Sequence, residues 1–220
     1  MKVIVTGATG MVGEGVLLVC LNHPEIEEVL VISRKSPGKV HAKLKEAILP
    51  DFSTLGALKD QLIDYDACFF CAGISSIGHT EESFFRGTYE MVVPFARQLS
   101  EINPKSTFIY VSGAGTDSSE IGKVMWARVK GKTENALSKL PFASVHNFRP
   151  GFMKPVKGQT QIKGWLKLAY VLWPLMYLFM PAWSCSLEQV ALAMIQLAKT
   201  KKDVNPVEVK DMKRLAAESA

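Results

Sequence analysis

The sequence has little cysteine and little histidine, with four residues of each among 220. Four cysteines in a chain of this length do not build a disulfide framework. The histidines are scattered, without ligand spacing to one another or to the cysteines, so the sequence predicts no metal site. The strand-like run Val3–Val5 begins almost at the first residue, which leaves no space for a secretory signal. We therefore expect a cytoplasmic protein.

The chain also lacks a strong excess of charge of one sign. Its 26 basic and 21 acidic residues give a net charge of +5. This balance argues against a nucleic-acid partner and mildly favours an anionic ligand. Hydrophobic residues make up 48% of the chain and charged residues 21%, which excludes a disordered or collagen-like protein. The length of 220 residues predicts a single domain.

Short apolar runs alternate with patterns of helical spacing along most of the chain. Strands are predicted over residues 2–5, 28–33, 40–48, 66–71, 107–111, 143–148 and 207–209. Helices are predicted over residues 16–20, 55–63, 84–99, 123–140, 186–199 and 212–217. This alternation predicts an α/β fold with a Rossmann-type doubly wound parallel sheet. The alternation of strand and helix patterns is interrupted over residues 152–185, where we expect a small C-terminal cap.

Three glycines, Gly7, Gly10 and Gly13, stand where the first strand turns into the first helix. Without a Cβ atom they allow a tight turn, a close approach of the backbone to a pyrophosphate, and close packing of the helix on the sheet. The helix N-terminus offers N–H groups and a partial positive charge to phosphates. An ordinary strand-to-helix turn is the plainer alternative. We predict dinucleotide binding by Gly7, Thr9, Gly10, Met11, Val12 and Gly13.

The end of the second predicted strand lacks a carboxylate. Proteins that bind NAD generally place an acidic residue there for the ribose 2′-hydroxyl, whereas an arginine suits the 2′-phosphate of NADP. This sequence has Ser33, Arg34 and Lys35 at that point. A guanidinium can bind phosphate in a fork, and the lysine adds charge. The pattern favours NADP(H) over NAD(H), with a pair of solvated surface charges as the alternative.

Further short sequence motifs follow the glycine turn along most of the chain, in a specific order. They are Asp51-Phe52, Cys71-Ala72-Gly73, Val111 to Gly115, Lys130 to Glu134, and Phe148 to Gly151. With the Gly-x-x-Gly-x-x-Gly turn led by Thr6, they resemble the atypical, extended-like short-chain dehydrogenase/reductases. The likeness is greatest to the NmrA-like and Tat-interacting-protein-like branch, which is labelled NAD-dependent epimerase/dehydratase-like. The resemblance implies further cofactor contacts from Asp51, Phe52, Cys71, Ala72, Gly73, Ser112, Lys130, Arg149, Pro150 and Gly151.

The family's catalytic pair, Tyr-x-x-x-Lys, is altered in this sequence. In working reductases the lysine lowers the pKa of the tyrosine and binds the nicotinamide ribose, and the spacing of four places both on one helix face. The matching positions are Trp126 and Lys130. An indole has no accessible proton-transfer pKa, unlike a phenol, so the usual proton donor is missing. Ser112 is the hydroxyl nearest to the family's carbonyl-polarising serine. Other candidate proton sources are Tyr110, Tyr89, Thr116 and the substrate itself.

Two further segments allow more than one interpretation. Cys68 and Cys71 form a C-x-x-C pattern, but on a strand this spacing places the two sulfur atoms on opposite faces, which predicts buried structural thiols. The uncharged segment Leu168–Leu187 is interrupted by Pro174 and Pro181, which argues against a membrane span. A lid over an apolar substrate or a contact with a protein, including a second copy, is favoured over a membrane surface.

These observations lead to two functional hypotheses. The first is an NADP(H)-binding atypical reductase or epimerase-like enzyme that acts on an apolar small molecule beneath the cap. The second is a non-enzymatic regulator that senses NADP(H) and acts through a protein partner, as NmrA-like proteins do. Trp126 favours the second hypothesis, because it removes the usual proton donor.

Overall fold

The computed structural model describes residues 1–162, 177 and 179–219. Its centre is a seven-stranded sheet in the order β3-β2-β1-β4-β5-β6-β9, and every neighbouring pair is parallel. The strands are β1 (Lys2–Thr6), β2 (Glu28–Ser33), β3 (Leu44–Ile48), β4 (Ala67–Phe70), β5 (Thr107–Val111), β6 (Ser144–Arg149) and β9 (Val207–Glu208). The strand order reverses between β1 and β4, which confirms the predicted doubly wound Rossmann-type sheet.

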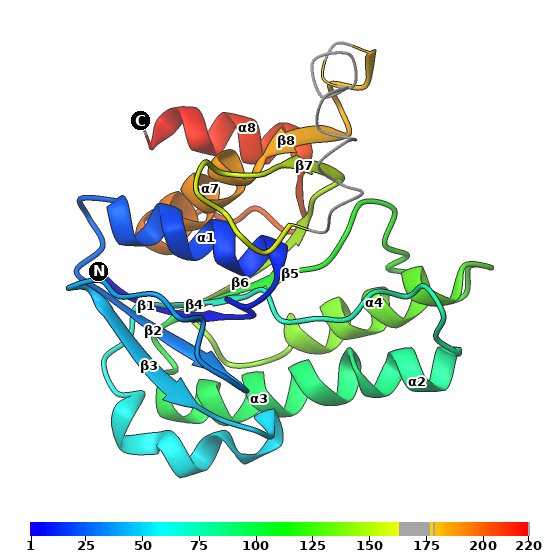
Figure 1. The fold of residues 1–220 in the computed structure, drawn as a ribbon. Coiled ribbons are helices and arrows are strands. Elements are labelled where there is room, and N and C mark those ends of the chain that lie inside the picture. Colours follow the sequence, from blue (N-terminus) through cyan, green and yellow to red (C-terminus); the bar gives the residue numbers. More distant parts are fainter. Residues whose placement is uncertain (163–176, 178, 220) are drawn as a thin grey trace.

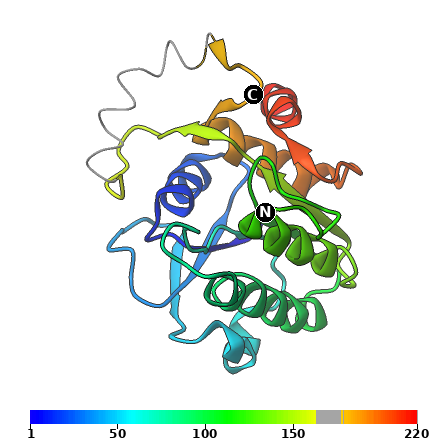
Figure 2. The same ribbon diagram turned by 90° about the vertical axis from the view of Figure 1, so that its right-hand side faces the viewer.

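Helices cover both faces of this sheet (Figure 1). The elements are α1 (Met11–Asn22), η1 (Phe52–Gln61), α2 (Glu81–Arg86), α3 (Tyr89–Ile102), α4 (Met125–Leu137), α7 (Leu187–Thr200) and α8 (Val209–Glu218). One layer holds α1, α7 and α8, and the other holds α2, α3 and α4. Figure 2 shows α1 beside α7 and α3 beside α4. The C-terminal pair, α7 and α8, forms a small helical part on the first layer.

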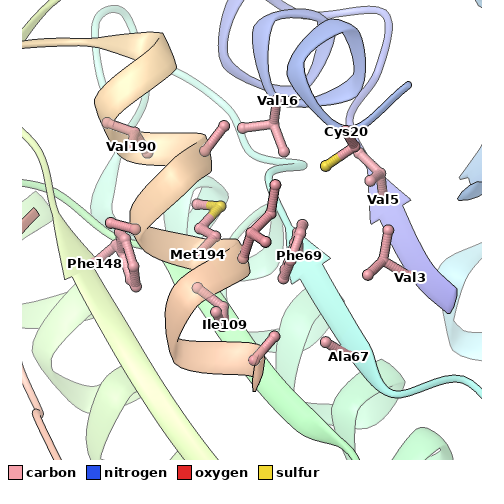
Figure 3. Packing of buried hydrophobic residues seen from close by; sticks show 14 of the residues in the cluster. Val3, Val5, Val16, Cys20, Ala67, Phe69, Ile109, Phe148, Val190 and Met194 are labelled. Atoms are coloured by element: carbon pink, nitrogen blue, oxygen red, sulfur yellow. The ribbon is translucent and has the colours of Figure 1, made fainter. Parts of the chain in front are cut away.

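Two hydrophobic cores lie on the two faces of the sheet, because successive strand residues point to opposite sides. Figure 3 shows the first core, where Val5, Phe69 and Ile109 of the strands meet Val16 of α1 and Met194 of α7. The second core lies under α3 and η1. It includes Ile4, Leu30, Phe52, Leu55, Cys68, Phe70, Phe95, Phe108 and Tyr110. Cys68 therefore faces the second core, and Cys71 packs against the first, which confirms the predicted separation of the two sulfur atoms.

Three predicted elements differ from the observed ones. Strand β3 begins at Leu44 rather than at residue 40, and Val40 is fully exposed. The segment 55–63 lies in and after a 3-10 helix, η1. The helix predicted over 84–99 is two helices, because Thr88 has φ −121° and ψ −77°, outside the helical region. At the same break Ile74 packs against Gly87, where an added Cβ atom would lie 2.3 Å from Ile74 Cδ1.

Residues 163–176 and 178 of the expected cap, residues 152–185, lie outside the described residues. Its two flanks, β7 (Phe152–Lys154) and β8 (Ser184–Ser186), pair in parallel as a separate small sheet. The interpretation of Leu168–Leu187 as a lid, a contact surface or a membrane segment therefore stays a prediction. Within the part of the chain that is described, no helix is long and apolar enough to cross a membrane.

Candidate functional site

A cavity of about 550 Å³ opens at the carboxyl ends of β1, β2 and β4. This is the edge of a doubly wound sheet at which nucleotides bind, beside the point where the strand order reverses. The cavity is lined by Gly7, Thr9, Gly10, Ser33, Arg34, Pro50, Asp51, Phe52, Ser53, Cys71, Ala72, Gly73, Ile74, Arg86, Gly87, Glu90 and Met91. Nine of the residues predicted to contact the cofactor are among them: Gly7, Thr9, Gly10, Arg34, Asp51, Phe52, Cys71, Ala72 and Gly73.

The glycine turn is shaped by close backbone approaches. Gly7 has φ +71°, and a Cβ atom there would lie 2.6 Å from the backbone nitrogen of Ala72. A Cβ atom on Gly13 would lie 2.2 Å from the carbonyl oxygen of Gly7, so Gly13 packs α1 onto the turn rather than lining the cavity. Gly10 is the N-cap of α1 and has no side chain to bond the first N–H groups of the helix. Those groups and the helix dipole fit an anionic ligand.

The Thr6 hydroxyl fixes the end of β4 beside the glycine turn. Thr6 Oγ1 accepts hydrogen bonds from the backbone nitrogens of Cys71 and Ala72, both at 3.1 Å. Thr6 is buried at the end of β1, so this pair of bonds ties the end of β4 to the glycine turn. The small residues Cys71, Ala72 and Gly73 are thereby held against the floor of the cavity.

The other end of the cavity carries Arg34 and Asp51. Arg34 is exposed at the end of β2, in a turn that is ordered by the Ser33 hydroxyl, which donates to the carbonyl oxygen of Lys35 at 2.7 Å. Asp51 accepts a hydrogen bond from the backbone nitrogen of Ser53 at 2.8 Å, and this bond lowers the pKa of its carboxyl group. Lys35 was predicted to contact the cofactor but does not line the cavity.

A second, smaller cavity of about 220 Å³ continues the first. The two share Cys71, Ala72, Gly73 and Ile74. Ser112, Lys130, Pro150 and Val12, all predicted site residues, line the second cavity. The remaining lining residues are Thr88, Val92, Tyr110, Val111 and Met153. Gly7 of the glycine turn and Lys130 thus line two neighbouring cavities that share four wall residues.

Lys130 reaches this second cavity from α4. Its ammonium donates to the carbonyl oxygen of Ser112 at 2.5 Å and lies 5.9 Å from the ring centre of Tyr110. Burial lowers its pKa to about 8, although the charge of Glu134 acts in the opposite direction. Ser112 Oγ lies 3.0 Å from Thr116 Oγ1, and the Thr116 hydroxyl donates to the carbonyl oxygen of Gly113 at 2.7 Å. Ser112 is therefore the donor in the pair of hydroxyls.

Trp126, which the resemblance places at the family's tyrosine position, lines neither cavity. Its ring packs against the loop after β5, where an added Cβ atom on Gly115 would lie 3.6 Å from Trp126 Cη2. Of the alternative proton sources, Tyr110 lines the second cavity, whereas Tyr89 stacks on Phe85 with 4.8 Å between ring centres. Thr116 bonds Ser112 and lines neither cavity.

Arg149 and Gly151, predicted to contact the cofactor, line neither cavity. The Arg149 guanidinium binds both carboxylate oxygens of buried Glu134, at 3.1 and 2.6 Å, and lies 3.5 Å from Glu208. This pairing holds β6 against α4 and β9, and the contact of Arg149 with a cofactor stays a prediction. Gly151 leaves room for the backbone of Trp183, whose carbonyl oxygen would lie 2.3 Å from an added Cβ atom.

The sequence analysis missed a carboxylate in the first turns of α1. Glu14 is fully buried and accepts hydrogen bonds from the backbone nitrogens of Thr160 and Gln161, at 2.9 and 2.7 Å. It also pairs with Lys39 Nζ at 2.9 Å. Burial by itself would raise the pKa of Glu14, but Lys39 and the N–H groups of residues 160 and 161 lower it to about 2. One side chain thus ties α1 to the loop after β2 and to the segment after β7.

The sequence analysis also missed the wall formed by α2 and α3. Arg86, Gly87, Glu90 and Met91 line the larger cavity, and Thr88 lines the smaller one. No glycine motif or end of a strand marks these positions in the sequence. The break at Gly87 and Thr88, which turns one predicted helix into two, is the only local signal that would have placed them near the site.

No group of histidine, cysteine, aspartate and glutamate residues able to hold a metal ion occurs in the described part of the chain. The four cysteines carry free thiols. Burial raises the pKa of Cys68 and of Cys71, which makes a reactive thiolate at either position unfavourable.

Comparisons with known proteins agree with this geometry. A family model described as the NAD binding domain of semialdehyde dehydrogenase matches residues 2–99. The solved structure of DesIV, a dTDP-glucose 4,6-dehydratase from Streptomyces venezuelae with NAD and TYD bound, superposes with a TM-score of 0.68. It is 13% identical, and the match covers 100% of this chain and 80% of that one. At this identity the likeness shows the fold, a Rossmann-type α/β domain that this chain shares with the dehydratase. A Rossmann domain for a nicotinamide dinucleotide, as predicted, is supported, and the NmrA-like branch stays a prediction.

Fungal relatives carry names that bear on location. Protein FMP52, mitochondrial, of Meyerozyma guilliermondii is 25% identical over 154 residues, covering 70% of this chain and 65% of the relative. Protein fmp52, mitochondrial, of Aspergillus fumigatus is 29% identical over 170 residues, covering 73% and 68%. The prediction of a cytoplasmic protein is wrong, because these relatives are named mitochondrial. Unpaired cysteines indicate reducing surroundings, which do not specify one compartment.

Proposed function

We propose that the protein binds NADP(H) in preference to NAD(H), and that it is an oxidoreductase or epimerase-like enzyme acting on an apolar small molecule. The observation that carries the cofactor preference is the end of β2, where Ser33 and Arg34 line the larger cavity. A carboxylate at this point binds the 2′-hydroxyl of NAD, whereas a guanidinium binds a 2′-phosphate.

The residues present fit such a cofactor along its length. The backbone of Gly7 and Gly10 and the N-terminus of α1 would hold the pyrophosphate. Asp51 and Phe52 would lie beside the adenine, and Lys130 beside the nicotinamide ribose. When bound, the cofactor supplies hydride transfer, while the protein provides position and electrostatics.

The second cavity supports an apolar substrate. Its wall includes the side chains of Val12, Val92, Val111 and Met153. Polar groups converge there from Thr88, Ser112 and Lys130. A mostly apolar wall with a few polar groups is the usual form of a small-molecule site.

Titration of the pure protein with NADPH and with NADH tests the cofactor proposal. An Arg34→Ala variant is expected to bind NADPH about 10- to 100-fold more weakly, the equivalent of one charge-assisted phosphate contact, with NADH affinity nearly unchanged. Arg97→Ala is the matched control, because Arg97 is exposed on α3 and lines neither cavity. Equal affinity for both cofactors, unaffected by Arg34→Ala, would contradict the preference.

The second candidate function is a non-enzymatic sensor of NADP(H). The observation that favours it is Trp126, whose ring covers the loop after β5 instead of presenting a hydroxyl to the cavity. A sensor would bind NADPH but would not oxidise it with any carbonyl compound. We also propose that the segment around residues 165–183 contacts a protein partner, a second copy of the chain or a membrane. Light scattering tests for the dimer, and cosedimentation with vesicles tests for the membrane contact.

A further inference from the structure

Five side chains with an O–H, S–H or N–H group line the second cavity, and only one of them can release a proton near neutral pH. They are Cys71, Thr88, Tyr110, Ser112 and Lys130. Aliphatic hydroxyls do not titrate in this range. Burial raises the pKa of Cys71 and that of Tyr110, with a smaller contribution from the charge of Glu134 to the shift of Tyr110. Lys130 is the remaining group with a pKa near this range.

The surroundings of Lys130 leave its ammonium without a tight ion pair. From α4 itself comes Glu134, but both of its oxygens are bound by Arg149 of β6. The β5 strand presents Tyr110, and the end of β4 presents the Cys71 thiol. Within the described residues, no carboxylate lies at ion-pair distance from Lys130, and its hydrogen-bond acceptor is the neutral carbonyl of Ser112. A lysine bound only to a neutral acceptor can lose its proton without leaving an anion unpaired.

The electrostatics of the site agree with this geometry. Burial lowers the pKa of Lys130 to about 8, close to the range in which a general acid is most effective at physiological pH. A lysine that forms an ion pair with a carboxylate would instead have a pKa far above that range.

We propose that Lys130 itself donates the proton in carbonyl reduction, in the place of the absent tyrosine. This inference rests on the proposed function as a reductase. The carbonyl carbon takes a hydride from the reduced nicotinamide dinucleotide, and the C=O double bond becomes a single bond. The carbonyl oxygen takes a proton from the Lys130 ammonium to form the alcohol. The neutral amine, still bonded to the Ser112 carbonyl, takes a proton back from water.

The experiment compares the wild type with Lys130→Arg and with Lys132→Arg as the matched control. Arginine keeps the positive charge but does not release its proton at these pH values. Lys132 lies on the same helix, with its ammonium 5.2 Å from the ring centre of Phe85, and lines neither cavity. NADPH affinity is measured by fluorescence, turnover with 9,10-phenanthrenequinone as the carbonyl probe, and the pKa of Lys130 by reductive methylation at a series of pH values.

The proposal predicts that wild-type turnover falls tenfold per pH unit above about pH 8, and that methylation of Lys130 follows the same curve. Lys130→Arg is expected to lose at least about 100-fold in turnover, measured at NADPH concentrations that saturate each variant so that a change in cofactor affinity does not enter the comparison. Lys132→Arg keeps the wild-type profile. A flat pH profile, an ordinary lysine titration, or an active Lys130→Arg variant would overturn it.

Two other outcomes separate this inference from the proposed function. A wild-type protein that binds NADPH but does not turn over the probe overturns the role of Lys130 and leaves the cofactor site standing. A protein that binds neither NADPH nor NADH overturns both, because the cofactor site is then absent.

Discussion

The two cavities differ in the groups that surround them. The larger one has the glycine turn, the helix N-terminus and a positive residue at the end of β2. The smaller one has Lys130 on its wall, whereas Trp126, four residues earlier on α4, packs against the loop after β5 and lines neither cavity. On the proposed function, dinucleotide binding and chemistry therefore depend on separate parts of the chain, and one can change while the other remains intact.

The contrast has a physical basis. The glycine turn at the larger cavity depends on close backbone packing, because a Cβ atom would lie 2.6 Å from a backbone atom at Gly7 and 2.2 Å from one at Gly13. The smaller cavity depends on the chemical nature of single side chains such as Lys130 and Ser112. On the proposed function, cofactor binding depends chiefly on the fold, and turnover depends on a few residues on it.

The largest expected effect comes from Gly13→Ala. Its Cβ atom would lie 2.2 Å from the carbonyl oxygen of Gly7, so α1 or the turn must move. We expect NADPH affinity to fall by about 100-fold or more, equivalent to about 3 kcal/mol, and the melting temperature to fall with it. Gly73→Ala is the control for stability, because its Cβ atom meets nothing within 4 Å. Wild-type affinity and stability in Gly13→Ala would show that the turn does not need this close contact.

The second largest expected effect is a loss of protein stability rather than of NADPH affinity. Arg149→Met removes the partner of Glu134, whose side chain is 4% exposed, and leaves a buried charge unpaired. We expect a loss of about 3–5 kcal/mol in the free energy of unfolding, measured by urea denaturation.

The double variant Arg149→Met with Glu134→Gln tests the cause of that loss. It should recover part of the stability, because no unpaired charge is then left in the interior. NADPH affinity below the melting temperature should stay at the wild-type value in both variants. A selective loss of NADPH affinity in a folded Arg149→Met variant would support the predicted contact of Arg149 with the cofactor.

A third prediction concerns acid stability. The pKa of Glu14 is about 2 in the folded protein, against 4.5 for an ordinary glutamate. The stability from its ionised form is present above pH 4.5 and is lost as the pH falls toward 2. Its contribution is about 3 kcal/mol. Urea denaturation between pH 5 and 3 should therefore show a smaller decrease for Glu14→Gln than for the wild type, and parallel curves would contradict the pairing.

The smallest expected effect is that of Trp126→Tyr. A phenol on the same helix face as Lys130 adds a second acid, with an ordinary pKa of about 10. We expect turnover of a carbonyl probe to rise a few-fold and the decline above about pH 8 to move upward. An unchanged profile would show that a side chain at residue 126 does not reach the reacting atoms.

The sequence predicts local elements well where burial is continuous. The bounds of β2, Glu28–Ser33, and β5, Thr107–Val111, agree with the predicted ranges, because strands covered on both faces are apolar throughout. The glycine turn also carries its own signal. By contrast, the ion pair of Arg149 with Glu134 was not predicted, because the two residues come from different elements and no local pattern shows such a pairing. The wall at Arg86 to Met91 was missed for the same reason.

Glu14 has a consequence for how the chain is made. The Thr160 nitrogen that bonds its carboxylate lies 146 residues further along the sequence. A ribosome therefore completes the first helix long before it supplies the groups that cover that helix. Until then the carboxylate is hydrated, and the N-terminal half of the nascent protein exposes a surface that the finished protein hides. A truncated product that ends before Thr160 keeps this surface exposed, which gives proteases and chaperones a means to tell it from the complete chain.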